Sequence, residues 1–301
     1  MEKITFREWA NIWLETYKKG TVKVNTYKMT YYDTFRLYLI PQFGEMRLDE
    51  ITRKNIVEYM VDMSYKYSQT VLSKIRICLH SMYSAAVEEK LVEYNPANNL
   101  KIKSYIPKIK KSTYSEKEAK LLFNYASTHR YGLGICIMLD TGLRCSEMLG
   151  LKWDDIDFEN GWLFVNRASV AVNGKAFVSS PKSESSRRVI PISHRLISLL
   201  ADKKYSKNES DYIVPAPSGM AYTPATYTKN RYNILFKDCE KDIGLHRLSP
   251  HELRHTCGTL LYQKSGDIYA VSKYLGHCNV NITSKFYVHS SPEILRDKLK
   301  M

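Results

Sequence analysis

Apolar side chains recur three and four positions apart through much of the first hundred residues, which is the spacing of a helix with one buried face. The clearest example is the set Phe6, Trp9, Ala10, Trp13, Leu14 and Tyr17. A second example is the set Ile56, Val57, Tyr59, Met60 and Met63. Between them, helical spacing covers residues 26–39, Pro41 and Gly44 act as breakers, and Thr52 is a suitable N-cap. With a further helix over about 68–89, this pattern predicts a helical bundle.

A different pattern begins near residue 161, where short β-prone runs replace the helical spacing. The runs cover residues 162–165, 169–172, 177–179 and 189–192, and Asn173-Gly174 and the segment PKSESS interrupt them. Such runs predict a small antiparallel sheet. Helical patterns flank it on both sides, beginning with a capping box at Ser115 and Glu118. The predicted fold class is α+β and mainly helical, with an N-terminal helical bundle and a mixed second domain.

A basic segment, KIKSYIPKIKKS, separates the bundle from the second domain. Its Pro107 prevents a continuous helix. We expect a bundle over residues 1–100, a linker over 101–112 and a mixed domain over 113–301. The linker has no acidic residue and contains Lys101, Lys103, Lys108, Lys110 and Lys111. It is either a solvated connection or a segment that binds a phosphate backbone.

The net charge of +14 concerns partners rather than fold, and it favours a polyanion such as nucleic acid. The six cysteines lie far apart, without the spacing of a zinc knuckle or a redox motif, which indicates a reducing compartment. The N-terminus does not resemble a signal peptide, and no apolar run approaches the roughly 18 residues of a membrane span. We therefore expect a cytoplasmic protein that does not bind a membrane.

Two short segments of the second domain place cations where they can bind a phosphate. In TGLRCSEMLGL, Arg144 begins a helix and Glu147 follows three residues later on the same face. The pair is either a surface ion pair or an arginine fork that a carboxylate holds against a phosphate. In SSPKSESSRRVIPI, Lys182 lies on a turn between strands. It is either a solvent-exposed lysine or a general acid that protonates a departing 5′ oxygen.

The segment LSPHELRHTCGTLL matches the zinc protease pattern H-E-x-x-H through His251, Glu252 and His255. Local structure gives a better account, because Ser249, Pro250 and Glu252 form the capping box of a helix. Glu252 then bonds to backbone instead of acting as a base. His251 and Arg254 lie in the first two turns, where the helix dipole favours an anion. We therefore predict a phosphate-binding helix and no metal.

The last two segments contain a histidine and a tyrosine. In KYLGHCNVNI, Gly276 ends a helix and His277 follows it. In NITSKFYVH, Tyr287 lies on a short helix ten residues after His277. Tyr274 is a weaker candidate for chemistry, because it belongs to an apolar face with Ala270, Val271 and Leu275.

Taken together, these segments resemble the tyrosine recombinase (phage integrase) family. The sequence contains TGLR, a hairpin lysine, H-x-x-R, LGH and a tyrosine followed by V-H in this order, and IPQFGEMRLDEIT resembles a turn of the family's core-binding domain. The resemblance covers essentially the whole chain. It implies a helical core-binding domain and a catalytic domain that close around duplex DNA. The implied catalytic residues are Arg144, Lys182, His251, Arg254, His277 and Tyr287.

The resemblance assigns a role to each of these residues. Arg144 and Arg254 clamp the scissile phosphate, and Lys182 is the general acid. The two histidines donate to the non-bridging oxygens or shuttle protons, while Glu147 and His255 support the site. Tyr287 is the nucleophile and forms a 3′-phosphotyrosyl bond, which a 5′ hydroxyl of another strand reseals. The cations supply the charge stabilisation, so neither a metal, another cofactor nor ATP is expected.

The resemblance also implies partners: double-stranded recombination sites, three further copies in a tetramer, and in some members an excisionase or a DNA-bending protein. Larger integrases carry an additional arm-binding domain, so this chain either uses simple sites or is a truncated form. The segment SSPEILRDKLKM predicts a short helix that packs on its own domain or on a neighbouring protomer.

Several functions remain open from the sequence. Integration or excision of a phage or mobile element is the first, and chromosome dimer resolution is the alternative within the family. A type IB topoisomerase, a DNA-binding regulator and a zinc protease are more remote.

The linker lysines provide a first test. Replacing Lys108, Lys110 and Lys111 together by alanine should weaken binding to every duplex, because phosphate contacts carry no sequence information. Titration of binding against salt should show a slope that falls by roughly 0.9 for each lost phosphate contact. An unchanged slope would mean that the segment is only solvated.

Overall fold

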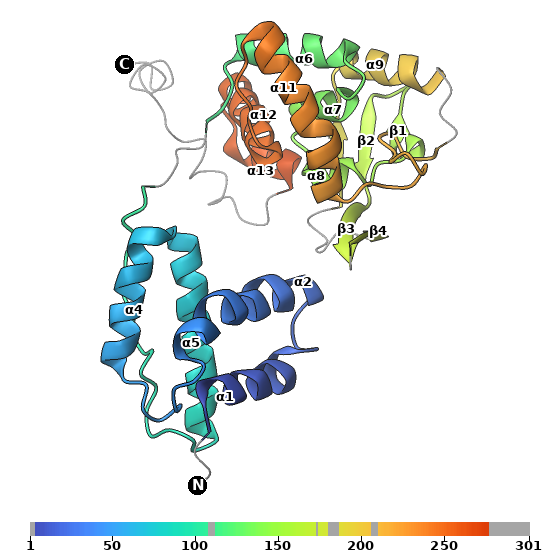
Figure 1. The fold of residues 1–301 in the computed structure, drawn as a ribbon. Helices are drawn as coiled ribbons and strands as arrows, with labels where there is room; N and C mark the ends of the chain where they lie inside the picture. Colours follow the sequence, from blue (N-terminus) through green and yellow to red (C-terminus); the bar gives the residue numbers. More distant parts are fainter. Residues whose placement is uncertain (1–3, 108–111, 173, 180–186, 206–209, 277–301) are drawn as a thin grey trace. The chain divides into compact units, whose positions relative to one another are not determined.

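The computed structural model describes residues 4–107, 112–172, 174–179, 187–205 and 210–276. The chain forms two compact units, Met1–Lys110 and Lys111–Met301 (Figure 1). Both are mainly helical, as the sequence predicts.

The first unit consists of helices around one apolar core. Its elements are α1 (Phe6–Trp13), η1 (Leu14–Lys18), α2 (Val24–Thr26), η2 (Tyr27–Tyr32), η3 (Phe35–Leu39), α3 (Ile40–Phe43), α4 (Arg53–Lys66) and α5 (Gln69–Glu88). The predicted apolar face of α1 is buried, with Phe6, Trp9 and Trp13 no more than 4% exposed. Thr52 caps α4 in a box with Asn55. These features of the predicted bundle are confirmed.

Pro41 does not break the helix as predicted. Helical turns run without interruption from Val24 to Phe43, and the helical run ends only at Gly44. Pro41 lies in the first turn of α3, directly after η3. Its missing N–H removes one hydrogen bond from the run, at the point where the π-helical turns of η3 give way to α3.

The second unit surrounds a central apolar helix with further helices and short strands. Its helices are α6 (Glu116–Thr128), α7 (Leu133–Thr141), α8 (Cys145–Met148), η4 (Trp153–Asp155), α9 (His194–Tyr205), α10 (Pro224–Tyr227), η6 (Thr228–Tyr232), α11 (Asn233–Ile243), α12 (Pro250–Ser265) and α13 (Ile268–Leu275). Its strands are β1 (Ile156–Asp157), β2 (Trp162–Val165), β3 (Ala168–Val172), β4 (Lys175–Ser179) and β5 (Arg188–Pro191). Because α7 is buried on nearly all sides and contacts α6, α8, α9 and α12, it fixes the place where α8 begins.

The strands form two sheets within the described ranges, although the sequence predicts one. β2 lies between β1 and β5, and β3 pairs with β4 as a separate hairpin, all antiparallel. Leu163, Val165 and Ile190 are buried and hold β2 and β5 against the core, whereas β3 and β4 are largely half-exposed. β1 has only two residues, too few for a recognisable alternation.

The α12 capping box is as predicted. The Glu252 carboxylate accepts from the Ser249 N–H at 2.8 Å, and the Glu252 N–H donates to Ser249 Oγ at 3.3 Å. Pro250 occupies the first turn. Glu252 therefore holds the start of α12, and the capping interpretation of the H-E-x-x-H segment accounts for its contacts.

No described helix is long and apolar enough to cross a membrane.

The capping box of α12 gives a test of stability. Replacing Glu252 by alanine should lower the free energy of unfolding by about 1 kcal/mol, the usual cost of a lost cap. Chemical denaturation measures this change. Glu118→Ala is the matched control, because Glu118 forms the same box with Ser115 at the start of α6. Stoichiometric zinc in the purified protein that disappears only with Glu252→Ala would overturn the capping interpretation.

Candidate active site

Arg144 and Glu147 meet at the start of α8, as their spacing predicts. Gly142 ends α7 with a φ of +63°, and the chain then turns so that Arg144 becomes the N-cap of α8. Glu147 Oε2 accepts from the Arg144 N–H at 3.0 Å, and Arg144 Nη1 donates to Glu147 Oε1 at 2.6 Å. The Arg144 side chain is 40% exposed while that of Glu147 is 4% exposed. The carboxylate is therefore inside, and the guanidinium reaches the surface.

Arg254 approaches the same place from α12. Its side chain is 2% exposed. Nη1 donates to the Gly142 carbonyl at 2.8 Å, Nη2 donates to the Leu275 carbonyl at 2.6 Å, and Nη1 lies 4.0 Å from Glu147 Oε2. Arg254 thus joins the ends of α7 and α13 and adds a second positive charge beside Glu147.

A third arginine, Arg188 at the start of β5, was not among the residues singled out from the sequence. Its Nη2 lies 3.0 Å from Glu147 Oε2 and its Nη1 lies 3.3 Å from Glu147 Oε1. The side chain is only 7% exposed. Strand alternation could have indicated that Arg188 is buried, because it lies two residues before the buried Ile190 and so shares its face of the strand.

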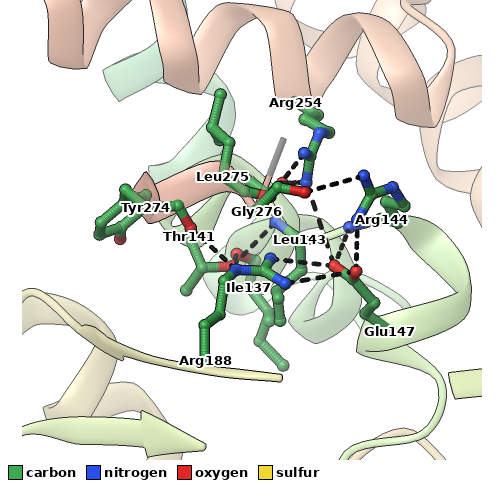
Figure 2. A network of polar contacts seen from close by, with 11 residues as sticks. Ile137, Thr141, Leu143, Arg144, Glu147, Arg188, Arg254, Tyr274, Leu275 and Gly276 are labelled. Carbon is green, nitrogen blue, oxygen red and sulfur yellow. Dashed lines mark hydrogen bonds and ion pairs between the residues drawn. The ribbon is translucent and has the colours of Figure 1, made fainter. Parts of the chain in front are cut away.

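The end of α13 connects the three arginines (Figure 2). Three consecutive carbonyls each accept from a different guanidinium. Tyr274 accepts from Arg188 Nε at 2.8 Å, Leu275 accepts from Arg254 Nη2 at 2.6 Å, and Gly276 accepts from Arg144 Nη2 at 3.2 Å. A helix C-terminus carries partial negative charge and so attracts cations. Gly276 ends the helix with a φ of +70°, as the sequence predicts.

The charges at the site do not balance. Burial raises the pKa of the Glu147 carboxyl, but the ion pairs with Arg188 and Arg144 outweigh it, and the net pKa lies below its ordinary value. Glu147 is therefore ionised at neutral pH. One carboxylate faces three guanidinium groups, so an excess of positive charge remains, and a partly buried excess of this kind favours a bound anion.

This excess of charge lies beside a hollow of about 670 Å³. Residues from α8, α10, η6, α11 and α12 line it, namely Arg144, Cys145, Ser146, Pro224, Ala225, Thr228, Lys229, Asn233, Ser249, Pro250, His251 and Arg254. His251 is exposed on its rim, and its ring packs edge-to-face on the buried His255 at a centroid distance of 4.4 Å. Cationic or proton-donating side chains from α8, η6 and α12 therefore line one hollow.

The structure brings together part of the set of candidate residues. Arg144, His251 and Arg254 line the hollow, Glu147 pairs with Arg144 beside it, and the His255 ring packs against His251. Lys182, His277 and Tyr287 lie outside the described residues, as do Lys108, Lys110 and Lys111. Lys101 and Lys103 are exposed in the first unit.

Tyr274 packs as its apolar neighbours predict. It contacts the buried Val271 and Leu275 and is itself partly buried. Its hydroxyl donates to the Pro191 carbonyl at 3.1 Å, and burial raises its pKa well above the ordinary value. A tyrosine in this environment is a poor source of phenolate.

The lowered pKa of Glu147 gives a pH test. A carboxyl whose pKa is lowered on folding contributes stability that is present above its ordinary value of 4.5 and is lost as the pH falls through the folded value. Glu147→Gln should cost about 3 kcal/mol at neutral pH, as loss of a buried ion-pair partner does, and this cost should shrink below pH 4.5. Denaturation at a series of pH values measures it. Glu159→Gln, at an exposed position, should leave the profile unchanged, and a Glu147→Gln cost that is constant with pH would contradict the assignment.

Two family models match the two units of the chain. Residues 113–293 match the model of the phage integrase family, and residues 5–64 match the phage integrase N-terminal SAM-like domain. A "Tyrosine recombinase XerC-like" protein of Caldanaerobacter subterraneus subsp. tengcongensis is 30% identical over 251 residues. That match covers 75% of this chain and spans 64% of the relative's length.

Solved structures show the same fold. The integrase of transposon Tn1549, in complex with a circular intermediate DNA, superposes with a TM-score of 0.83 at 20% identity, covering 99% of each chain. A lambda integrase tetramer bound to a Holliday junction gives a TM-score of 0.72 at 17% identity, covering 96% of this chain and 80% of that one. Because the family model spans residues 113–293, the chain belongs to the phage integrase family of tyrosine recombinases.

Proposed function

We propose that the protein is a site-specific DNA recombinase that cleaves and rejoins strands through a 3′-phosphotyrosyl intermediate, and that it integrates or excises a phage or mobile element. One observation carries the proposal. Three arginines converge on the single buried carboxylate of Glu147, beside a hollow that His251 and Lys229 also line. An excess of positive charge beside a hollow suits an anion such as a phosphodiester, and the chain belongs to the phage integrase family.

Arg144 is the group best placed to bind the scissile phosphate. Two of its five N–H groups bond to Glu147 and Gly276 through the side chain, and its guanidinium is partly exposed in the hollow. A fork held at one edge can present its other edge to two phosphate oxygens. Arg254 lines the same hollow, and the exposed His251 can donate to a non-bridging oxygen.

The remaining chemistry is proposed for Lys182, His277 and Tyr287. The Tyr287 oxygen attacks phosphorus, the bond to the 5′ oxygen breaks, and Lys182 gives that oxygen its proton. A histidine accepts the phenolic proton. A free tyrosine has a pKa near 10, so the cations of the site must favour its phenolate during attack. Rejoining reverses these steps with a 5′ hydroxyl as the nucleophile, so no ATP is consumed.

Duplex recombination sites and three further copies of the chain are the proposed partners, with an excisionase or a DNA-bending protein as possible accessories. The tetramer of lambda integrase on a Holliday junction supports this arrangement by fold alone. The proposed domains are a core-binding domain over residues 1–100, a linker over 101–112 whose lysines contact DNA, and a catalytic domain over 113–301. We also propose a cytoplasmic location, because a DNA substrate of this kind lies there.

Chromosome dimer resolution is the second candidate function. It is the alternative within the family, whose members include a "Tyrosine recombinase XerC-like" relative at 30% identity as well as transposon integrases. The target decides between the two, because a resolving enzyme acts at one chromosomal site and an integrase acts at the ends of an element.

The nucleophile is the decisive test. Tyr287→Phe removes one oxygen and almost no volume, so folding and DNA binding should persist while covalent chemistry disappears. The protein is incubated with sheared DNA from the organism that carries the gene, and DNA bound to it after denaturation is sequenced to locate the site. A nicked duplex of that sequence then traps the adduct at a DNA 3′ end, which denaturing gels display.

Two further variants complete the test. Arg144→Lys should form the adduct at least about a hundredfold more slowly, because an ammonium cannot reproduce the bidentate contact. Tyr269→Phe, at an exposed position, should behave as wild type. An adduct that persists in Tyr287→Phe would show that another tyrosine is the nucleophile, and no adduct from wild type with any DNA would reject the proposed function.

A further inference from the structure

Arg188 contacts two parts of the site at once, although it does not line the hollow. Its guanidinium covers both carboxylate oxygens of Glu147, and its Nε–H donates to the Tyr274 carbonyl. With a side chain that is 7% exposed, it is enclosed by protein. Because Arg188, unlike Arg254, is not part of the lining of the hollow, we expect it to act through other residues of the site.

The contacts of Glu147 show what Arg188 does to Arg144. Oε1 accepts from Arg144 Nη1 at 2.6 Å and from Arg188 Nη1 at 3.3 Å. Oε2 accepts from the Arg144 backbone at 3.0 Å and from Arg188 Nη2 at 3.0 Å. Arg188 thus contacts both oxygens of Glu147, whereas the Arg144 side chain contacts only Oε1 and directs its Nη2 to the Gly276 carbonyl. Without Arg188, the carboxylate would attract the Arg144 fork onto both oxygens and away from the hollow.

Arg188 also fixes the ends of two described segments. It begins β5, where Val165 is its partner in the sheet, and Lys182 precedes it by six residues. It packs so closely on Gly276 that a Cβ there would lie 3.0 Å from its Nη1 and 3.1 Å from its Cδ. His277 follows Gly276 directly. One buried side chain therefore holds the backbone that leads to two of the proposed catalytic residues.

We propose that Arg188 is a positioning residue of the strand-cleavage reaction, which holds both oxygens of Glu147 so that the Arg144 fork stays directed at the scissile phosphate. The inference rests on the proposed function for its catalytic consequence, but its effect on Arg144 can be measured without DNA.

The test uses Arg188→Met and the double variant Arg188→Met/Glu147→Gln. The single variant should form the adduct with the nicked duplex at least about tenfold more slowly at saturating protein, with the dissociation constant within about twofold of wild type. In the double variant the carboxylate that attracts Arg144 is neutral, and Gln can still complete the capping box. The adduct rate should therefore recover at least about threefold relative to the single variant. A purely structural role for Arg188 predicts that the neutral side chain restores stability, because it removes an uncompensated buried charge, while the accessibility of Arg144 is the same in all three proteins.

Labelling with phenylglyoxal, which reacts with arginine side chains, provides a readout that needs no DNA. Mass spectrometry should show Arg144 labelled in wild type, labelled more slowly in Arg188→Met, and labelled at the wild-type rate again in the double variant. If wild type forms no adduct with any DNA, the proposed function fails, and labelling still decides whether Arg188 controls Arg144. Equal labelling of Arg144 in all three proteins would overturn the inference.

Arg167→Met is the matched control. Arg167 pairs with the buried Asp155 at 3.0 Å, so this variant also leaves a buried carboxylate without its arginine, outside the Glu147 network. It should lower the unfolding temperature as Arg188→Met does, yet change neither the labelling of Arg144 nor the adduct rate. If Arg188→Met does not fold, Arg188→Lys retains the charge with a single contact and should give an intermediate labelling rate. If a folded Arg188→Lys variant shows the wild-type labelling rate and the wild-type adduct rate, the inference that the Arg188 guanidinium must hold both oxygens of Glu147 is wrong.

Discussion

The ionised carboxylate of Glu147 is the group on which the rest of the site depends. A buried charge is costly unless partners compensate it, and here three arginines from three different elements do so. The pairing ties α8 to β5 and α12, elements that are far apart in the sequence. The cost of burying one acid is thus offset by a fixed arrangement of three cations, whose excess charge then favours an anion.

The C-terminus of α13 gives that arrangement its second anchor. Tyr274, Leu275 and Gly276 present three successive carbonyls that have no partner within their own helix, and each accepts from a different arginine. Arginine suits this double task, because its planar group donates in several directions at once while lysine offers a single centre. The backbone before His277 is therefore held by the same groups that surround Glu147 (Figure 2).

Features set by neighbours in the sequence were predictable, and features set by distant strands were not. The N-cap at Thr52 and the capping boxes at Ser115 and Ser249 depend on residues close in the sequence, and all three are present. The Arg144 contact with Glu147 has the same local origin. Strand alternation indicates that Arg188 lies on the buried face of β5, but its partner Glu147 is 41 positions away and no local pattern identifies it. For the same reason two sheets were predicted as one.

The geometry also explains how a carboxylate can belong to a site for an anion. An uncompensated carboxylate beside a phosphate would repel the phosphate. The carboxylate would also compete for the arginine that binds the phosphate. Here Glu147 is 4% exposed and two guanidinium groups that are themselves almost wholly buried share its charge. Its repulsion toward the hollow is therefore largely cancelled, while its contact with Nη1 of Arg144 still fixes the orientation of that fork. The carboxylate orients one exposed arginine, and the buried arginines neutralise the carboxylate.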